Sequence, residues 1–294
     1  MNLRPRRWKW WLVGLAVLVV VAALLGSGFA ETYRVEIKRF TVTSPDVPAA
    51  FDGTRIALIT DIHRGAFFSQ GRVGRLVERV NSLKPDVVVL GGDYVYADVD
   101  YEASCFAELA SLEAPLGRFA VLGNHDYGEY ETGDTGGTDP TSAIEAIKGA
   151  GLTLLDNQAI WVMKADARIR VGGVADYDEG IPQLAPTIGG TSPRDFVILL
   201  SHNPDIAEDL PAGAVDLMLS GHTHGGQVTF FGLWAPHLPS KYGQKYRTGL
   251  VTTGSTTVIV SNGVGTIFPP IRLFARPQIV EVTLRSGPST ALRP

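Results

Sequence analysis

The sequence predicts an α/β fold in which buried strands alternate with amphipathic helices. Continuous apolar runs at 55–60, 87–90 and 119–122 are typical of strands that are covered on both faces. Between the first two runs, one helical face is marked by apolar residues at the spacing of an α-helix: Val73, Leu76, Val77 and Val80. Strands and helices interleaved in this way predict a layered sandwich with a largely central sheet.

The rest of the chain continues the same alternation. It predicts helices at 101–113 and 142–149 and strands at 152–155, 168–174, 196–200 and 215–219. Three later strands have no helices between them, which predicts a second, more antiparallel sheet: 250–253, 256–260 and 277–284. An alternating segment at 33–38 predicts a half-buried strand ahead of the first buried one.

The composition is that of a folded chain with an acidic body. Hydrophobic residues make up 45% and charged residues 19% of the 294, which excludes intrinsic disorder. The net charge is −4, and the first 30 residues contribute +4, so residues 31–294 carry −8. Such a body lacks the basic footprint of a nucleic-acid-binding protein. Cys105 is the only cysteine, which excludes an intramolecular disulfide, and its helical context favours core packing.

Residues 1–30 are predicted to be a signal peptide or a membrane anchor. Trp10 to Leu25 is an unbroken apolar run of sixteen residues, between the ~20 of a spanning helix and the ~7–15 of a signal-peptide core. Small residues around Ala30 favour cleavage after it, whereas the tryptophans within 8–11 fit the aromatic belt of a retained anchor. Both alternatives stay open. The positive-inside rule predicts a cytoplasmic N-terminus with the following residues outside the cytoplasm.

The remaining chain is divided into a lead-in strand and linker at 31–50, one folded domain at 51–285 and a tail at 286–294. Two loops carry further expectations. The acidic, glycine-rich stretch 128–139 is either a lid over the site or an insertion. The loop 226–247 holds five aromatic residues, which either line a substrate groove, rest on a membrane surface or pack as a compact loop.

Polar residues gather where five of the buried strands end. They are Asp61 and His63, then Asp93, then Asn124 and His125, then His202, and finally His222 and His224. The carboxyl ends of strands line the ligand crevice of open α/β sheets, so these side chains are expected to converge. In extended backbone, residues two apart point the same way. This predicts that Asp61 and His63 clasp one ion together, as do His222 and His224.

Five of the six histidines lie at these strand ends, which points to metal ligation. The sixth, His237, is expected to be an ordinary core or surface residue. Imidazoles and carboxylates with one amide suit Mn, Fe or Zn. A structural zinc site is disfavoured because the set contains no thiolate.

In this order, the motifs resemble the calcineurin-like metallophosphoesterase superfamily, above all its bacterial, membrane-associated phosphodiesterase branch. The motifs are Asp-x-His, Gly-Asp, Gly-Asn-His-Asp, a later lone His and Gly-His-x-His, with support from 221–227, 261–265 and Pro270-Ile271-Arg272. The resemblance covers about residues 50–285. It implies that 51–285 is a calcineurin-like metallophosphoesterase domain, a β-sandwich of two mixed sheets flanked by helices (α-β-β-α).

The resemblance also implies a dinuclear centre with two divalent metal ions, Mn as the first choice and Fe or Zn as alternatives. Its ligands would be Asp61, His63 and His224 for the first ion, Asn124, His202 and His222 for the second, and Asp93 for both. A shared carboxylate offsets the repulsion between two ions ~3.5–4 Å apart.

The implied reaction is phosphoester hydrolysis, most of all of phosphodiesters, by a metal-activated hydroxide. His125 would act as general acid toward the leaving alkoxide, and Asn124 would donate a hydrogen bond to a phosphate oxygen. Many relatives support this histidine with an Asp where this chain has Tyr96, so the partner of His125 is open; Asp126 is too close in sequence to face it. Arg64 is either a phosphate contact or a solvated surface residue.

Two other functions are alternatives to phosphodiester hydrolysis. One is a pyrophosphatase acting on a nucleotide-linked lipid precursor of the UDP-diacylglucosamine type, a cytoplasmic substrate that conflicts with the predicted topology. The other is a non-catalytic metal-binding module, which the filled ligand positions disfavour. The expected partners are a phosphoester substrate, with a lipid- or envelope-linked ester as one alternative, and the membrane. The expected location is the bacterial cell membrane with the domain outside, or export after cleavage.

Overall fold

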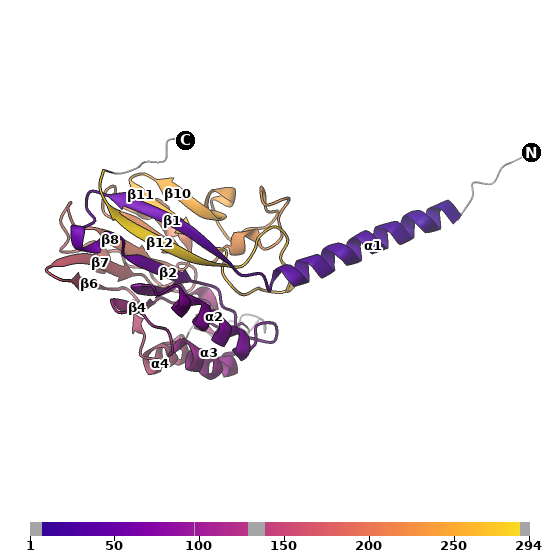
Figure 1. The fold of residues 1–294 in the computed structure, drawn as a ribbon, viewed down its shortest axis with the longest axis horizontal. Helices are drawn as coiled ribbons and strands as arrows, with labels where there is room; N and C mark the ends of the chain where they lie inside the picture. Colours follow the sequence, from indigo (N-terminus) through magenta and orange to yellow (C-terminus); the bar gives the residue numbers. More distant parts are fainter. Residues whose placement is uncertain (1–7, 97, 129–138, 289–294) are drawn as a thin grey trace, which may run out of the picture.

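The computed structural model describes residues 8–96, 98–128 and 139–288. The predicted α/β fold is confirmed: two six-stranded sheets pack face to face, and helices cover the outer face of the first (Figure 1). Most of the stretch 128–139, expected to be a lid or an insertion, lies outside the described residues.

Helix α1 (Trp8–Glu31) projects away from the sandwich (Figure 1). Among the described residues it is the single helix long and apolar enough to cross a membrane, over Trp10–Glu31 with a mean hydropathy of 2.6. A signal sequence would give the same length and composition, so both alternatives for residues 1–30 remain.

The first sheet has the strand order β1–β12–β2–β3–β4–β5. Its strands are β1 (Glu36–Ser44), β12 (Gln278–Ser286), β2 (Arg55–Ile59), β3 (Val87–Leu90), β4 (Gly117–Ala120) and β5 (Thr153–Leu154). Strands β2 to β5 are parallel, β1 is parallel to β12, and β12 runs antiparallel to β2. The sheet is therefore mixed.

The second sheet has the order β10–β11–β9–β8–β7–β6. Its strands are β6 (Gln158–Lys164), β7 (Ala167–Gly173), β8 (Val197–Leu200), β9 (Leu217–Ser220), β10 (Gly249–Thr253) and β11 (Thr256–Val260). Strands β7, β8, β9 and β11 are parallel, and only the edge strands β6 and β10 are antiparallel to their neighbours.

The second sheet is more antiparallel than the first, as expected, because two of its five strand pairings are antiparallel against one of five in the first sheet. The expected place of β12 in the second sheet is wrong, because β12 pairs along its whole length with β1 in the first sheet. Strand β6 was not predicted. The absence of a helix between two strands does not show that both strands belong to the same sheet. In a sandwich, a loop can carry the chain from one sheet to the other.

Alternate residues of the central strands face two different cores. In β2, Ile56 and Leu58 pack between the sheets, whereas Ala57 and Ile59 pack beneath the helices. Both sets are buried, which explains why this strand is a continuous apolar run rather than an alternating one.

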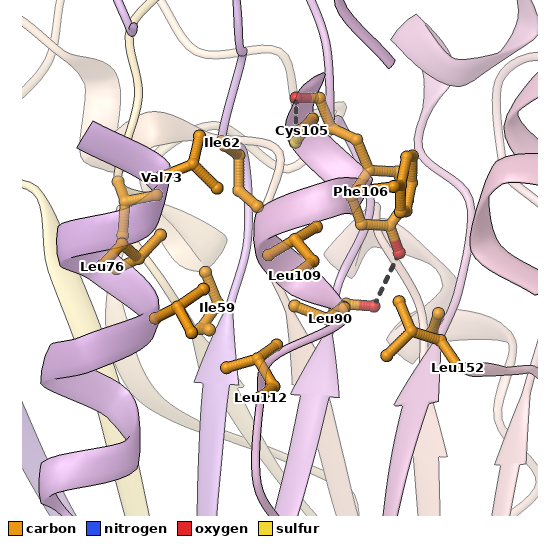
Figure 2. Close-up of a cluster of buried hydrophobic side chains, with 14 of the residues drawn as sticks. Ile59, Ile62, Val73, Leu76, Leu90, Cys105, Phe106, Leu109, Leu112 and Leu152 are labelled. Carbon is orange, nitrogen blue, oxygen red and sulfur yellow. Dashed lines mark hydrogen bonds between the residues drawn. The ribbon is translucent and has the colours of Figure 1, made fainter. Parts of the chain in front are cut away.

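Three helices cover the outer face of the first sheet: α2 (Gln70–Ser82), α3 (Glu102–Leu109) and α4 (Thr141–Gly149). Figure 2 shows Val73 of α2 and Leu109 of α3 directed toward Ile59 and Ile62. Cys105 is fully buried in the same cluster, with its thiol 3.6 Å from the Tyr94 carbonyl, which confirms its packing role. Within the described part of the chain, the outer face of the second sheet carries short helices: α5 (Ala185–Ile188) and the 3-10 turns Pro204–Asp209 and Gly243–Tyr246.

The strand register places α1 at the site end of the sandwich. Lys38 of β1 pairs with Val280 of β12, which pairs with Leu58 of β2. The start of β1, just after α1, therefore lies level with the carboxyl end of β2. The predicted site residues leave β2, β3 and β4 at this same end.

Candidate metal centre

The structure brings together polar side chains from five strand ends. Asp61 and His63 follow β2, Asp93 follows β3, Asn124 and His125 open a 3-10 helix after β4, His202 follows β8, and His222 and His224 follow β9. A cavity of about 130 Å³ is lined by five of these strand-end residues and by His237. The five are Asp93, Asn124, His125, His222 and His224. His237 was expected to be unrelated to the site, yet it borders this cavity from an exposed loop.

Asp61, His63, Asp93 and His224 form a compact buried cluster whose ligand atoms all lie within 4.8 Å of one another. The Nε2 atoms of His63 and His224 are 3.1 Å apart. His63 Nε2 lies 3.4 Å from Asp93 Oδ2, and His224 Nε2 lies 3.5 Å from Asp61 Oδ1. Two imidazoles and two carboxylates aimed at one point are a donor set that suits a divalent ion.

A second group of side chains, which includes His202, also approaches Asp93. His202 Nε2 lies 3.2 Å from Asp93 Oδ2, and its Nδ1 donates a 2.7 Å hydrogen bond to the Gly91 carbonyl, which fixes the ring. The rings of His202 and His222 are 5.0 Å apart. Asn124 Oδ1 is buried and has no hydrogen-bond partner among the described residues. A buried acceptor without a donor is costly in a folded chain and fits a cation at this place.

The backbone of the site differs from the predicted extended conformation. Asp61, His63, Asp93, His222 and His224 all have positive φ, between 47° and 69°. L residues rarely adopt this region, and such strain concentrates at functional sites. Asp61 and His63 still meet, but His222 turns toward His202 whereas His224 turns toward His63. The expectation that the last two clasp one ion is wrong, because their rings face different neighbours.

Close backbone packing requires glycine at two of the turns. Gly92 has φ +89°, and a Cβ atom there would collide with the backbone of Gly123. A Cβ on Gly221 would lie 2.5 Å from Asp61 Oδ2. These positions let the loops after β3, β4 and β9 approach one another around the carboxylates.

Burial keeps three of the imidazoles neutral. It lowers the pKa of His63 to about 3 and that of His222 to about 4. Burial and the neighbouring His63 also lower the pKa of His224 well below its usual value. Neutral imidazole is the form that binds a metal, so these rings need no proton release before ligation.

The pKa values of the two carboxylates in the cluster, Asp61 and Asp93, are shifted in opposite directions. Burial raises the pKa of Asp61 to about 6. Burial also acts to raise the pKa of Asp93, but the nearby His202 and His125 outweigh it and hold that pKa well below its ordinary value. In turn, Asp93 raises the pKa of His202 against the effect of burial. Asp93 is thus held in its charged form beside these histidines.

His125 lies beside the cluster and not within it. Its ring centroid is 4.9 Å from that of His63 and 5.5 Å from that of Tyr96. Its backbone N–H donates to Asp93 Oδ1 at 2.9 Å. Tyr96, which stands where many relatives have an acidic residue, therefore supplies an aromatic neighbour to His125.

Asp126 has a structural role that the sequence did not indicate. Its carboxylate accepts hydrogen bonds from the backbone N–H groups of Gly123 at 2.8 Å, Asp93 at 2.8 Å and Tyr94 at 2.9 Å. It joins the turns after β3 and β4. Burial and the nearby Asp93 raise the pKa of Asp126 to about 8.

Two further residues support the histidines. Asp178 Oδ2 lies 3.6 Å from His222 Nε2 and accepts a hydrogen bond from Asn203. Arg272 is fully buried, and its guanidinium donates to the carbonyls of His224, Asn262, Gly265 and Ala275. Asp178 gives no signal in the sequence, because it follows β7 in a segment without a motif.

Arg64 does not extend freely into solvent. Its guanidinium lies 4.4 Å from the centre of the Tyr101 ring and donates to the Gly65 carbonyl at 2.8 Å.

In the 226–247 loop, Tyr246 is buried, whereas Phe230, Phe231, Trp234 and Tyr242 are exposed.

Comparison with known proteins agrees with this geometry. Residues 54–226 match the family model described as Calcineurin-like phosphoesterase. The chain is 33% identical over 269 residues to the Uncharacterized metallophosphoesterase YkuE of Bacillus subtilis (strain 168), covering 89% of this chain and 90% of that one. It is 32% identical over 232 residues to the Phosphodiesterase YaeI of Escherichia coli (strain K12), covering 78% and 82%. A solved structure, that of TT1561 from Thermus thermophilus, matches with a TM-score of 0.44 at 13% identity, over 72% of this chain and 90% of that one.

The family model spans more than half of the chain, and both relatives are matched over most of their length. The resemblance drawn from the motifs is confirmed. The chain belongs to the calcineurin-like phosphoesterase family and is a phosphoric ester hydrolase.

Proposed function

We propose that this hydrolase is a phosphodiesterase with a dinuclear metal centre, with Mn as the preferred ion and Fe or Zn as alternatives. The observation that carries the proposal is the placement of Asp93 between two groups of donors, the His63–His224 side and the His202 side. The relative named Phosphodiesterase YaeI supports the preference for diesters.

In this proposal Asp61, His63 and His224 hold the first ion, and Asn124, His202 and His222 hold the second. Asp93 contributes one carboxylate to both. The ions would activate a water molecule as nucleophile and neutralise charge on the phosphate oxygens.

The chain's own residues perform the remaining steps. His125 stands at the cavity, outside the ligand cluster, where its protonated ring donates to the oxygen of the departing alcohol. The side-chain amide of Asn124 donates from its nitrogen to a phosphate oxygen, and its buried oxygen would be a ligand of the second ion. Asp126 keeps the turns of Asp93 and His125 in register through its three backbone hydrogen bonds.

We propose further that α1 is retained as a membrane anchor, with residues 31–294 outside the cytoplasm and a lipid- or envelope-linked ester as substrate. Its end is tied to the body, since Gly28 O accepts a 2.9 Å hydrogen bond from Arg272 N. A reporter enzyme fused after residue 294 tests the orientation. A cytoplasmic signal would overturn it and favour the lipid-precursor pyrophosphatase.

The catalytic proposal is tested on the purified full-length chain in detergent. We expect two metal ions per chain and turnover of bis(p-nitrophenyl) phosphate that exceeds turnover of p-nitrophenyl phosphate. Asp61→Asn should abolish turnover. Met163→Ala, on an exposed position of β6 far from the site, is the matched control.

The role of His125 as general acid can be tested by comparing substrates with different leaving groups. His125→Ala should keep both ions and lower kcat by about 10²–10⁴-fold for a diester with an alkyl leaving group. It should lower kcat much less for a p-nitrophenyl leaving group, which departs without a proton. Fewer than two ions per chain would overturn the dinuclear centre, and absence of turnover with any ester in the presence of Mn would favour the binding-module alternative.

A further inference from the structure

Two segments beside the end of α1 expose an unusual number of large apolar side chains. We call them the apolar collar, residues 228–235 and 266–275. Its exposed members range from 49% to 81% exposed: Phe230, Phe231, Leu233, Trp234, Phe268 and Phe274. Scattered apolar residues are normal on a protein surface, but a cluster of this kind marks a contact surface.

The two segments of the collar form one continuous surface. Thr229 N donates to Leu273 O at 3.0 Å, and Val228 pairs with Leu273 as an isolated bridge. The rings of Phe231 and Phe274, one from each segment, lie 5.4 Å apart. The collar is therefore joined by backbone hydrogen bonds as well as by side-chain packing.

The collar presents no exposed charge. Its eighteen residues include a single ionisable side chain, Arg272, and this guanidinium is fully buried on backbone carbonyls. A surface of eighteen residues that faces water or a polar partner ordinarily includes several exposed charged side chains. A charge-free surface rich in Phe, Leu and Trp is suited to the interface of a lipid bilayer.

The collar is attached directly to the end of α1. Arg272 N donates to Gly28 O at 2.9 Å, and Phe274 N donates to Glu31 Oε2 at 3.2 Å. Gly28 packs so closely that a Cβ atom there would lie 3.3 Å from the side chains of Ile271 and Leu273. The collar thus packs against one face of the last turn of the helix.

The length of α1 sets the depth of the collar. From Trp10 to Ala30 the helix is about 31 Å long at ~1.5 Å per residue, which matches the ~30 Å hydrocarbon core of a bilayer. When this span is centred in the membrane, Gly28 and Glu31 lie at its surface. The collar, bound to both residues, then lies at the same level.

We infer that the apolar collar is a second membrane contact, which seats the hydrolase domain on the bilayer that α1 crosses. The inference rests on the proposed anchoring by α1. Gln227, which directly precedes the first collar segment, and Ile267 of the second segment both line the metal-site cavity. The seated domain therefore opens its cavity beside the lipid headgroups.

Site-directed labelling tests the contact on the full-length chain. Cys105 is fully buried, and a fluorophore is attached instead to Leu233→Cys or Phe268→Cys in the collar. The matched control is Met163→Cys, which is 55% exposed on β6 at the opposite end of the sandwich. The proteins are placed in phosphatidylglycerol–phosphatidylethanolamine vesicles with or without lipids that carry a quencher near the headgroup.

We expect quenching at both collar positions to exceed quenching at Met163→Cys at least threefold. Equal quenching at all three positions would overturn the inference. A blue-shifted collar signal without lipid quenching would also overturn it, since a second protein would then cover the surface.

Flotation after an alkaline wash reports separately on α1. If the protein stays on the vesicles after the wash but its collar labels are not quenched, the collar contact is refuted and the anchor stands. If the wash extracts the protein but the collar labels were strongly quenched before it, the anchor is refuted and the collar contact is supported. Extraction without quenching would refute both.

Discussion

Asp126 follows His125 in the sequence, yet its carboxylate serves the backbone of the neighbouring turns. Three N–H groups converge on it, two of them from Asp93 and Tyr94. The strand-end pattern identified the candidate ligands from sequence, because strand ends converge in any α/β sandwich. It could not identify Asp126 or Asp178 as supports, because their partners across the site lie 32 residues or more away. Nor could it give the positive φ values of five site residues, or show that the rings of His222 and His224 face different neighbours.

Asp126→Ala should weaken metal binding about 10–100-fold, because residues that orient metal ligands have effects of this size. Loss of its carboxylate frees the turn that carries Asp93. Titration of the metal-free full chain with Mn²⁺, followed by calorimetry, measures the change. Asp98→Ala, whose carboxylate caps the exposed turn before α3, is the control. An unaltered affinity in Asp126→Ala would contradict the supporting role.

Asp216 gives a pH-dependent prediction away from the metal site. Its carboxylate accepts a 2.8 Å hydrogen bond from Val197 N, and burial raises its pKa to about 6 from an ordinary value of 3.8. A raised carboxyl pKa means that the folded state favours the proton. The associated stabilisation is present below about pH 4 and is lost as the pH rises through 6.

Asp216→Asn removes this titration. We expect the melting temperature of the variant, relative to wild type, to rise between pH 4.5 and pH 7, measured by scanning fluorimetry of the full chain. Asp166→Asn, in the turn between β6 and β7, should show no such trend. A difference between variant and wild type that is constant with pH would contradict the prediction.

At the scale of elements, the helices and the buried strands followed their sequence periodicity closely. Strands β2, β3, β8 and β9 have four or five residues and are apolar except for Arg55 and Ser220, and all of their residues but Arg55 are buried. The pairing of β12 with β1 was not predictable in this way. Those two strands lie 242 residues apart along the chain, and periodicity carries no information on partners at such a distance. The division of the chain at 31, 51 and 286 stays a prediction.

The packing of α3 can be tested at Leu109, which is fully buried between α2 and the first sheet (Figure 2). Leu109→Ala should cost about 2–5 kcal/mol of unfolding free energy, from lost apolar contact and the cavity left behind. Urea unfolding of the full chain in detergent measures it. Leu233→Ala removes the same atoms from an 81% exposed position and should cost less than about 0.5 kcal/mol. Similar losses in both variants would contradict the packing seen here.

At the scale of the molecule, the site is a buried, charge-dense end of an acidic sandwich. The body carries −8, and Asp61, Asp93 and Asp126 are buried within one small region. Burying carboxylates close to one another is unfavourable unless positive charge accompanies them. Bound divalent ions are therefore expected to stabilise the fold as well as to enable the reaction.

Removal of metal should lower the melting temperature of the full chain by several degrees. A ligand present at 100–1,000 times its Kd stabilises the folded state by about 2.7–4.1 kcal/mol. Dialysis against a chelator followed by calorimetry measures the loss, and addition of Mn²⁺ should restore it. Asp61→Asn, treated identically, is the control and should respond much less. A wild-type melting temperature that ignores the chelator would contradict this account.

Arg272 has one further consequence for any shortened form of the chain. Its backbone N–H is bound to Gly28 in α1, while its guanidinium holds the His224 carbonyl. Truncation at residue 31 would remove Gly28, and with it the acceptor for the backbone N–H of Arg272, a residue that also bonds the backbone of the candidate ligand His224. A difference in metal affinity between such a fragment and the full chain would therefore measure how far Arg272 couples α1 to the candidate site.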